Sequence, residues 1–157
     1  MSKKQQNDFV KKIIDLPTDQ KALASIVLAG VSVFLPWIGF GYSANIAGFS
    51  GGLNASVSGL SVDGGLVGLL SSIAGIYLFK KQDKWAFVPG AVNLVAGLGY
   101  VFNFFGPMSS VGFNYSSSFG SAAASADIKF GLILFVIFSG YYTFITGSDF
   151  LENHNNN

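Results

Sequence analysis

The stretch Lys80-Lys81-Gln82-Asp83-Lys84 is a short polar segment between two long apolar runs. The run before it extends from Leu66 to Phe79, and the run after it extends from Trp85 to Phe105. Five polar residues suffice for a tight connection between antiparallel helices and are too few for a separate folded element. The stretch therefore predicts a helical hairpin, and the length of its apolar arms predicts that the hairpin crosses a membrane.

The composition of the chain also indicates a membrane protein. Hydrophobic residues make up 50% of the 157 residues and charged residues only 11%, against about 25% charged in an ordinary soluble domain. The net charge is +1 and all nine basic residues are lysines, so nucleic-acid binding is not expected. The absence of cysteine excludes disulfides, thiolate metal sites and thiol nucleophiles.

Apolar runs of suitable length predict four spans, at about residues 22–38, 62–79, 85–105 and 128–146. The expected fold class is therefore an all-α membrane protein, a four-helix transmembrane bundle over residues 22–146 with β-prone extracytoplasmic loops at 39–62 and 106–127. Residues 1–21 are expected to form an amphipathic cytoplasmic segment on the membrane surface or, alternatively, a solvated tail. Residues 147–157 are expected to form a polar cytoplasmic tail.

The distribution of lysines predicts the orientation of these spans. Five lysines precede the first span and three lie in the turn at residues 80–84, so eight of the nine share one side. The positive-inside rule makes that side cytoplasmic. The expected location is the inner or plasma membrane, with a multipass chain and both termini in the cytoplasm.

Two of the predicted loops contain patterns typical of strands. Residues 53–58 alternate apolar and polar side chains, and the segment 42–49 is expected to pair with them across Ser50-Gly51-Gly52. A similar alternation surrounds Phe113 in the second loop. Four aromatic side chains are candidate contact residues on the outer loops: Tyr42, Phe49, Phe113 and Tyr115.

Small residues in the predicted spans indicate where helices pack closely. Gly64, Gly68 and Ser72 recur at four-residue intervals, and Gly97 is a small position in the third span. Asn93 is the most polar residue within any span. It is expected to form an interhelical hydrogen bond, and the alternative is that it lines an oligomeric pore.

The search for catalytic or metal-binding residues gives a negative expectation. Apart from Asp63 and Lys129 at the span edges, no Asp, Glu, Lys, Arg or His lies within the predicted spans, although proton relays and many transporters depend on such groups. No cluster of His, Cys or carboxylates suggests catalysis, a cofactor or a metal. Asp63 and Asp127 are interpreted as helix N-caps, with a shared cation site as the alternative.

The segment from about Phe34 to Phe79 resembles a pattern in small bacterial multipass membrane proteins of uncharacterised function. The residues that carry the resemblance are Leu35-Pro36-Trp37, the following Gly/Ser-rich stretch, and Gly59 to Asp63-Gly64 before an apolar helix. The resemblance implies a four-span protein of the bacterial envelope. The predicted plan is also similar to that of claudins, in topology only.

The expected function is that of a non-enzymatic integral membrane protein with a structural or interaction role. It would be a subunit or scaffold of a membrane assembly and would use its outer loops for contacts. The expected partners are membrane lipids, further copies of the chain and other membrane or envelope proteins. An oligomeric pore, such as a small channel or holin-like protein, is the alternative, and an immunity or accessory protein is a third hypothesis.

Overall fold

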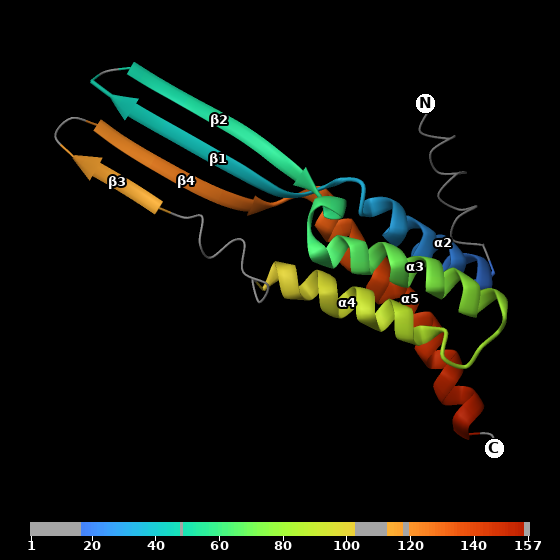
Figure 1. Cartoon of the computed structure of the whole chain (residues 1–157). Coiled ribbons are helices and arrows are strands. Elements are labelled where there is room, and N and C mark those ends of the chain that lie inside the picture. Colours follow the sequence, from blue (N-terminus) through green and yellow to red (C-terminus); the bar gives the residue numbers. More distant parts are fainter. Residues whose placement is uncertain (1–16, 48, 103–112, 118–119, 156–157) are drawn as a thin grey trace, which may run out of the picture.

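The computed structural model describes residues 17–47, 49–102, 113–117 and 120–155, with a sheet at one end of a group of helices (Figure 1). The helices are α2 (Thr18–Ser32), α3 (Asp63–Lys80), α4 (Phe87–Val101) and α5 (Phe130–Asn155), and a short 3-10 helix covers Gly59–Ser61. The strands are β1 (Pro36–Ile46), β2 (Phe49–Ser58), β3 (Phe113–Ser117) and β4 (Gly120–Ile128). The four strands form one antiparallel sheet in the order β2-β1-β4-β3.

The expected fold class, an all-α four-helix transmembrane bundle, is wrong. The two segments predicted to be loops contain most of an antiparallel sheet, and the first strand begins within the predicted first span, at Pro36. Bulky residues alternate with glycine at Ile38, Phe40 and Tyr42, a spacing that suits a strand. The fold is therefore mixed α/β, with the sheet joined to the helices by short connections.

The expected multipass location in the inner or plasma membrane, with both termini cytoplasmic, is not supported. Among the described residues only one helical segment, Phe130–Glu152, is long and apolar enough to cross a membrane. Helices α2 and α4 have 15 residues each. At 1.5 Å per residue such a helix is about 22 Å long, short of the roughly 30 Å hydrocarbon core. Helix α3 has 18 residues but includes Asp63 and Lys80.

Parts of the expected organisation lie outside the described residues. These parts are residues 1–16 of the N-terminal segment, residue 48 of the first predicted loop, residues 103–105 of the third predicted span, residues 106–112 and 118–119 of the second predicted loop, and residues 156–157 of the tail. At the other end of the chain, α5 continues to Asn155 through most of the segment predicted to be a polar tail.

The helical hairpin around Lys80–Lys84 is present. Helix α3 ends at Lys80, and the carboxylate of Asp83 accepts a 2.9 Å hydrogen bond from the backbone N–H of Trp85. The buried hydroxyl of Tyr142 in α5 lies 3.1 Å from the Gly75 carbonyl and 2.9 Å from the Ala86 carbonyl. Tyr142 thus links both arms of the hairpin to α5.

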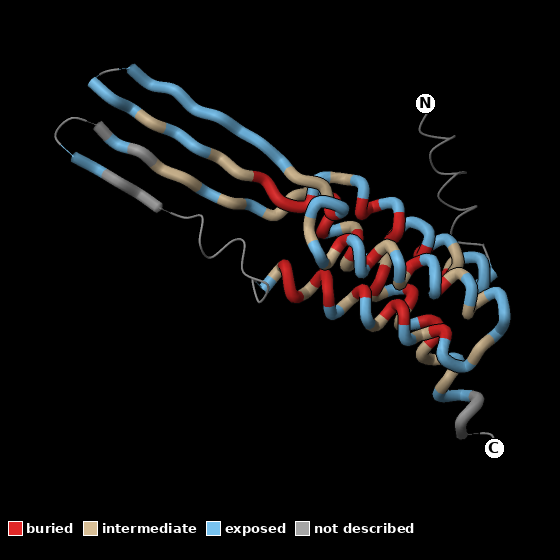
Figure 2. Tube along the Cα trace, viewed as in Figure 1, coloured by how far each residue is buried: buried red, intermediate tan, exposed pale blue. Residues whose placement is uncertain are grey.

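The hydrophobic core lies between the helices and continues to the base of the sheet. Figure 2 shows buried positions along the bundle and at the start of β1, whereas most of β2 is exposed. Trp37 in β1 is fully buried and packs on the Phe135 ring at 4.7 Å and on the Tyr100 ring at 6.0 Å between centroids. Its indole N–H donates a 3.0 Å hydrogen bond to the Ser32 carbonyl at the end of α2. Trp37 therefore fixes the sheet to the bundle.

The hairpin between β1 and β2 is tighter than the sequence pattern indicated. Ile46 pairs with Phe49, and Ser50, Gly51 and Gly52 lie within β2 rather than in the turn. Two-residue hairpin loops favour positive φ angles, and Ala47 adopts a φ of 50°. The chain therefore turns directly after Ile46, at Ala47.

Candidate functional site

The register of the sheet places apolar side chains on a single face. Residues directly paired across antiparallel strands point to the same side, and side chains alternate along each strand. Tyr42 pairs with Leu53 on one neighbouring strand and with Ala124 on the other. Extending this row along the strands gives the residues of the apolar face: Ile38, Phe40, Tyr42, Ala44, Ile46, Phe49, Gly51, Leu53, Ala55, Val57, Ala122, Ala124, Ala126 and Ile128.

The opposite face of the sheet is polar. Its positions are Gly39, Gly41, Ser43, Asn45, Ser50, Gly52, Asn54, Ser56, Ser121, Ala123, Ser125 and Asp127. Such a division between faces is typical of a sheet with water on one side and another layer on the other. The sheet therefore has the pattern of one half of a two-layer structure.

The apolar face is covered only near the bundle. Ile38 is 1% exposed, and Phe40, Val57 and Ile128 are partly buried against the core. Farther along β1, the exposed fraction rises to 45% at Tyr42 and 64% at Ile46. On β2 it is 75% at Leu53 and 84% at Phe49. The outer part of the face is an exposed apolar patch of the kind that marks an interaction surface.

The sheet brings together the four aromatic residues predicted as outer-loop contacts. Tyr42 and Phe49 both belong to the apolar face. Phe113 pairs with Ala124, and Tyr115 pairs with Ala122, so both occupy positions on the same face. The side chains of Phe113 and Tyr115 lie outside the described part of the chain. Sequence reasoning missed Ile46, Leu53 and the alanines of β4 as members of this surface.

The residues at the junction of sheet and helices position this surface. The backbone N–H of Lys129 donates a 2.8 Å hydrogen bond to the Trp37 carbonyl, so β1 is tied to the start of α5. The ammonium of Lys129 forms an ion pair with the carboxylate of Asp127. The interpretation of both aspartates as helix N-caps is wrong. Asp127 lies in β4, and Asp63 is the first residue of α3, whose N-cap is Val62. No group of three or more His, Cys, Asp or Glu in the described part of the chain could hold a metal.

The predicted helix-packing residues lie at contacts among three helices. A Cβ atom added at Gly68 would lie 2.6 Å from the Phe135 ring, and one at Gly97 would lie 2.7 Å from the Val136 side chain. Gly64 lies against the Tyr100 ring, and its backbone N–H donates a 3.2 Å hydrogen bond to the Tyr100 hydroxyl. The stripe on α3 thus contacts both α4 and α5.

The remaining two packing residues contact each other inside the bundle. The amide of Asn93 donates a 3.0 Å hydrogen bond to the hydroxyl of Ser72, which in turn donates to the Gly68 carbonyl at 2.8 Å. Asn93 is 0% exposed, so its side chain does not reach the surface of the chain. Its carbonyl oxygen has no hydrogen-bond partner among the described residues.

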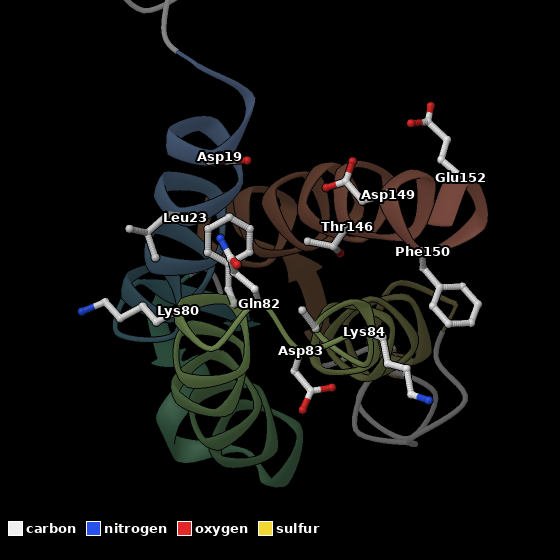
Figure 3. A pocket seen from close by; sticks show the side chains of 12 residues that line it. Asp19, Leu23, Lys80, Gln82, Asp83, Lys84, Thr146, Asp149, Phe150 and Glu152 are labelled. Atoms are coloured by element: carbon white, nitrogen blue, oxygen red, sulfur yellow. The ribbon is translucent and has the colours of Figure 1, made fainter. Parts of the chain in front are cut away.

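A pocket of about 830 Å³ lies at the end of the bundle opposite the sheet (Figure 3). Its lining combines Phe79 and Phe150 with charged side chains from α2, α5 and the hairpin turn. Partial burial, with smaller contributions from the carboxylates of Asp19 and Glu152, raises the pKa of Asp149. The lining contains four carboxylates, two lysines and one threonine, and no His or Cys.

An apolar groove of about 760 Å³ runs along α4 where α4 meets α3. Valine and alanine side chains of α4 form most of its wall, and Asp63 and Tyr100 lie among its lining residues. The groove continues the apolar outer surface of the helices and has no cluster of polar groups that would orient a reacting substrate.

Comparisons with protein families, with curated proteins and with solved structures found no match. The geometry alone therefore defines the candidate site, which is the exposed apolar face of the sheet.

Proposed function

We propose that the chain is a non-enzymatic structural and interaction protein whose helices contact membrane lipid and whose sheet contacts another protein. The observation that carries the proposal is the exposed apolar face of the sheet. Every second residue along β1 is apolar and belongs to that face. On the neighbouring strand β2, Leu53 and Phe49 of the same face are 75% and 84% exposed. A soluble monomer rarely leaves such a contiguous surface in water, so a partner layer is expected there.

The outer surfaces of the helices support the lipid contact. Each of the four described helices carries exposed large apolar side chains, among them Val31 of α2, Leu70 of α3, Val95 of α4 and Ile137 of α5. Helix α5 also contains the segment that is long and apolar enough to cross a membrane. Exposed apolar surface around a bundle is favourable against lipid and unfavourable against water.

Vesicle flotation tests the lipid contact. Purified wild-type chain is expected to rise with phosphatidylcholine vesicles in a density gradient. The double variant Val95→Lys/Ile137→Lys should lower the partition coefficient at least tenfold, because moving a charged side chain from water into contact with lipid hydrocarbon is unfavourable. The matched control is Leu53→Lys, which places the same charge on the sheet and should float like the wild type.

Two results would contradict the proposal. The wild-type chain could remain at the bottom of the gradient with vesicles present, which would exclude lipid as the partner of the helices. Alternatively, Leu53→Lys could reduce flotation as much as the double variant, which would assign the lipid contact to the sheet. Circular dichroism of each variant verifies that helix and strand content are retained.

A further inference from the structure

We propose that a second copy of this chain covers the apolar face of the sheet with its own apolar face, so that the two sheets form a β-sandwich. The inference rests on the proposed function in one respect, the assignment of protein contacts to this face. It goes further by naming the partner. Two sheets packed in this way would lie about 10 Å apart, with their strands within about 30° of each other.

The two central strands of the face are complementary to each other. Large side chains lie along β1, including Phe40 and Tyr42. Small side chains lie along β4, at Ala124 and Ala126. A raised strip over β1 therefore adjoins a flat strip over β4. The central strands of two copies fit when β1 of each copy lies on β4 of the other.

One symmetry operation achieves this fit. Strands β1 and β4 are the two central strands of each sheet. A two-fold axis that lies midway between the two stacked sheets, parallel to the strands and centred over the β1–β4 pair, relates the two copies. The operation sets β1 of one copy over β4 of the other. It also keeps strand direction, so both groups of helices lie at the same end of the pair. Both copies could then contact one membrane through their helices.

The charge on the face is compatible with self-association. None of the residues that the register assigns to the apolar face is charged, whereas Asp127 lies on the polar face. Two copies therefore meet without repulsion between like charges, which would otherwise disfavour a contact between identical surfaces.

The area of the face is close to that of a specific contact. Seven residues on each of β2, β1 and β4 and five on β3 give roughly 400 Å² of sheet from standard strand spacings. Two copies would thus cover about 800 Å² before the relief of the side chains is counted, near the roughly 1,000 Å² of a specific interface. Confinement of both copies to one membrane would raise their effective concentration and favour pairing.

Pairing along the sheet edge does not explain the exposed face. Strand β2 is an edge strand of ten residues, and an added strand could extend the sheet there. Such an extension would leave Leu53 and Tyr42 as exposed as before. Only a layer stacked on the face removes them from water.

Single cysteines provide the test, because the chain has none of its own. Ala124→Cys places a thiol on the apolar face of β4, and Ala123→Cys places one on the polar face of the same strand. Both alanines are half-buried, so the two variants are closely matched. The purified full-length variants, reconstituted in phosphatidylcholine vesicles, are treated with a bismaleimide long enough to join thiols on facing sheets.

We expect Ala124→Cys to give a covalent dimer of twice the chain mass in at least fivefold higher yield than Ala123→Cys. Adding Leu53→Lys to Ala124→Cys should abolish the dimer, because it buries an unpaired charge in the sandwich. Equal yields from Ala124→Cys and Ala123→Cys, as edge pairing or random collision would produce, would overturn the inference. A persistent monomer with Ala124→Cys would also overturn it and would point to lipid or a different protein on the face.

Failure of the dimer is distinguishable from failure of the proposed function. Flotation with vesicles and no dimer would support the lipid contact and exclude a second copy as the partner of the sheet. An Ala124→Cys dimer in detergent and no flotation with vesicles would support the sandwich and exclude the lipid contact.

Discussion

The side-chain amide of Asn93 in α4 donates a 3.0 Å hydrogen bond to the hydroxyl of Ser72 in α3, and both side chains are buried. We predict that Ser72→Ala lowers the free energy of unfolding by about 1–3 kcal/mol, because it leaves the amide N–H group unpaired. Asn93→Leu should lower the free energy of unfolding by a smaller amount, because it removes the donor together with a carbonyl oxygen that has no partner among the described residues. Denaturant unfolding in mild detergent measures both changes, and the reverse order of the two variants would contradict the prediction.

Gly65 and Gly147 should respond in opposite directions to substitution by alanine. A Cβ atom at Gly65 would collide with the backbone carbonyl of Gly59, whereas one at Gly147 would meet nothing within 4 Å. We predict that Gly65→Ala destabilises the fold by about 2 kcal/mol or more, since backbone atoms must move. Gly147→Ala should stabilise α5 by about 0.5–1 kcal/mol through lower unfolded-state entropy. Thermal unfolding measures both, and a stable Gly65→Ala variant would show that the contact between α3 and the 3-10 helix is wrongly placed.

The two tryptophans should report on different environments. Trp37 is fully buried beside Phe135 and Tyr100, whereas Trp85 is 51% exposed. In Trp85→Phe, which retains Trp37, emission should be blue-shifted and resist quenching by iodide. In Trp37→Phe, which retains Trp85, emission should be quenched readily. Equal quenching of the two variants in detergent would contradict the burial of Trp37 at the junction.

Loss of Trp37 should also weaken the fold. Trp37→Phe removes the hydrogen bond to the Ser32 carbonyl and part of the volume between sheet and bundle. We predict a loss of about 1–3 kcal/mol in the free energy of unfolding. Trp85→Phe is the control, and it should change the unfolding midpoint little, because exposed substitutions usually have small effects.

Stability should increase as the pH falls through the range in which Asp149 titrates. Burial, Asp19 and Glu152 raise the pKa of Asp149, so the native state binds its proton more readily than the unfolded state does. This contribution to stability is complete below the unfolded-state pKa and is lost as pH rises through the native pKa. Asp149→Asn should therefore raise the melting temperature at pH 7, and the gain should shrink toward pH 4.

A double-mutant cycle between Asp19 and Asp149 separates the effect of the raised Asp149 pKa from a general loss of negative charge. Because Asp19 contributes to the raised pKa of Asp149, Asp19→Asn should stabilise the wild-type chain and have a smaller effect in the Asp149→Asn background. A gain from Asp149→Asn that is the same at pH 4 and pH 7 would count against the prediction.

The sequence predicted some elements of the fold because their signals are local. The polar turn at Lys80–Lys84 between apolar runs identified α3 and α4, and the alternation from Leu53 to Ser58 identified part of β2. The alternation of glycine with Ile38, Phe40 and Tyr42 was also a strand signal, but a high content of apolar residues made the region look like a helix end and a loop.

Other elements depend on contacts that no local pattern reveals. Strand β4 is built largely of alanine and serine, which have low strand propensity, and it forms because it pairs with β1 about 80 residues earlier. The four aromatic contact residues were named from composition, but their common face follows only from this pairing. The first helix was predicted to end too late because apolar residues continue into β1, where Pro36 and the burial of Trp37 favour strand over helix.

The covalent connections between sheet and helices have a mechanical consequence. Only Lys129 separates the end of β4 from the start of α5, and residues 33–35 separate α2 from β1. A force applied at the tips of the strands would therefore reach two helices through almost no slack chain. The sheet would behave as a lever arm, and a sideways load at its far end would become a torque at Trp37 and Lys129.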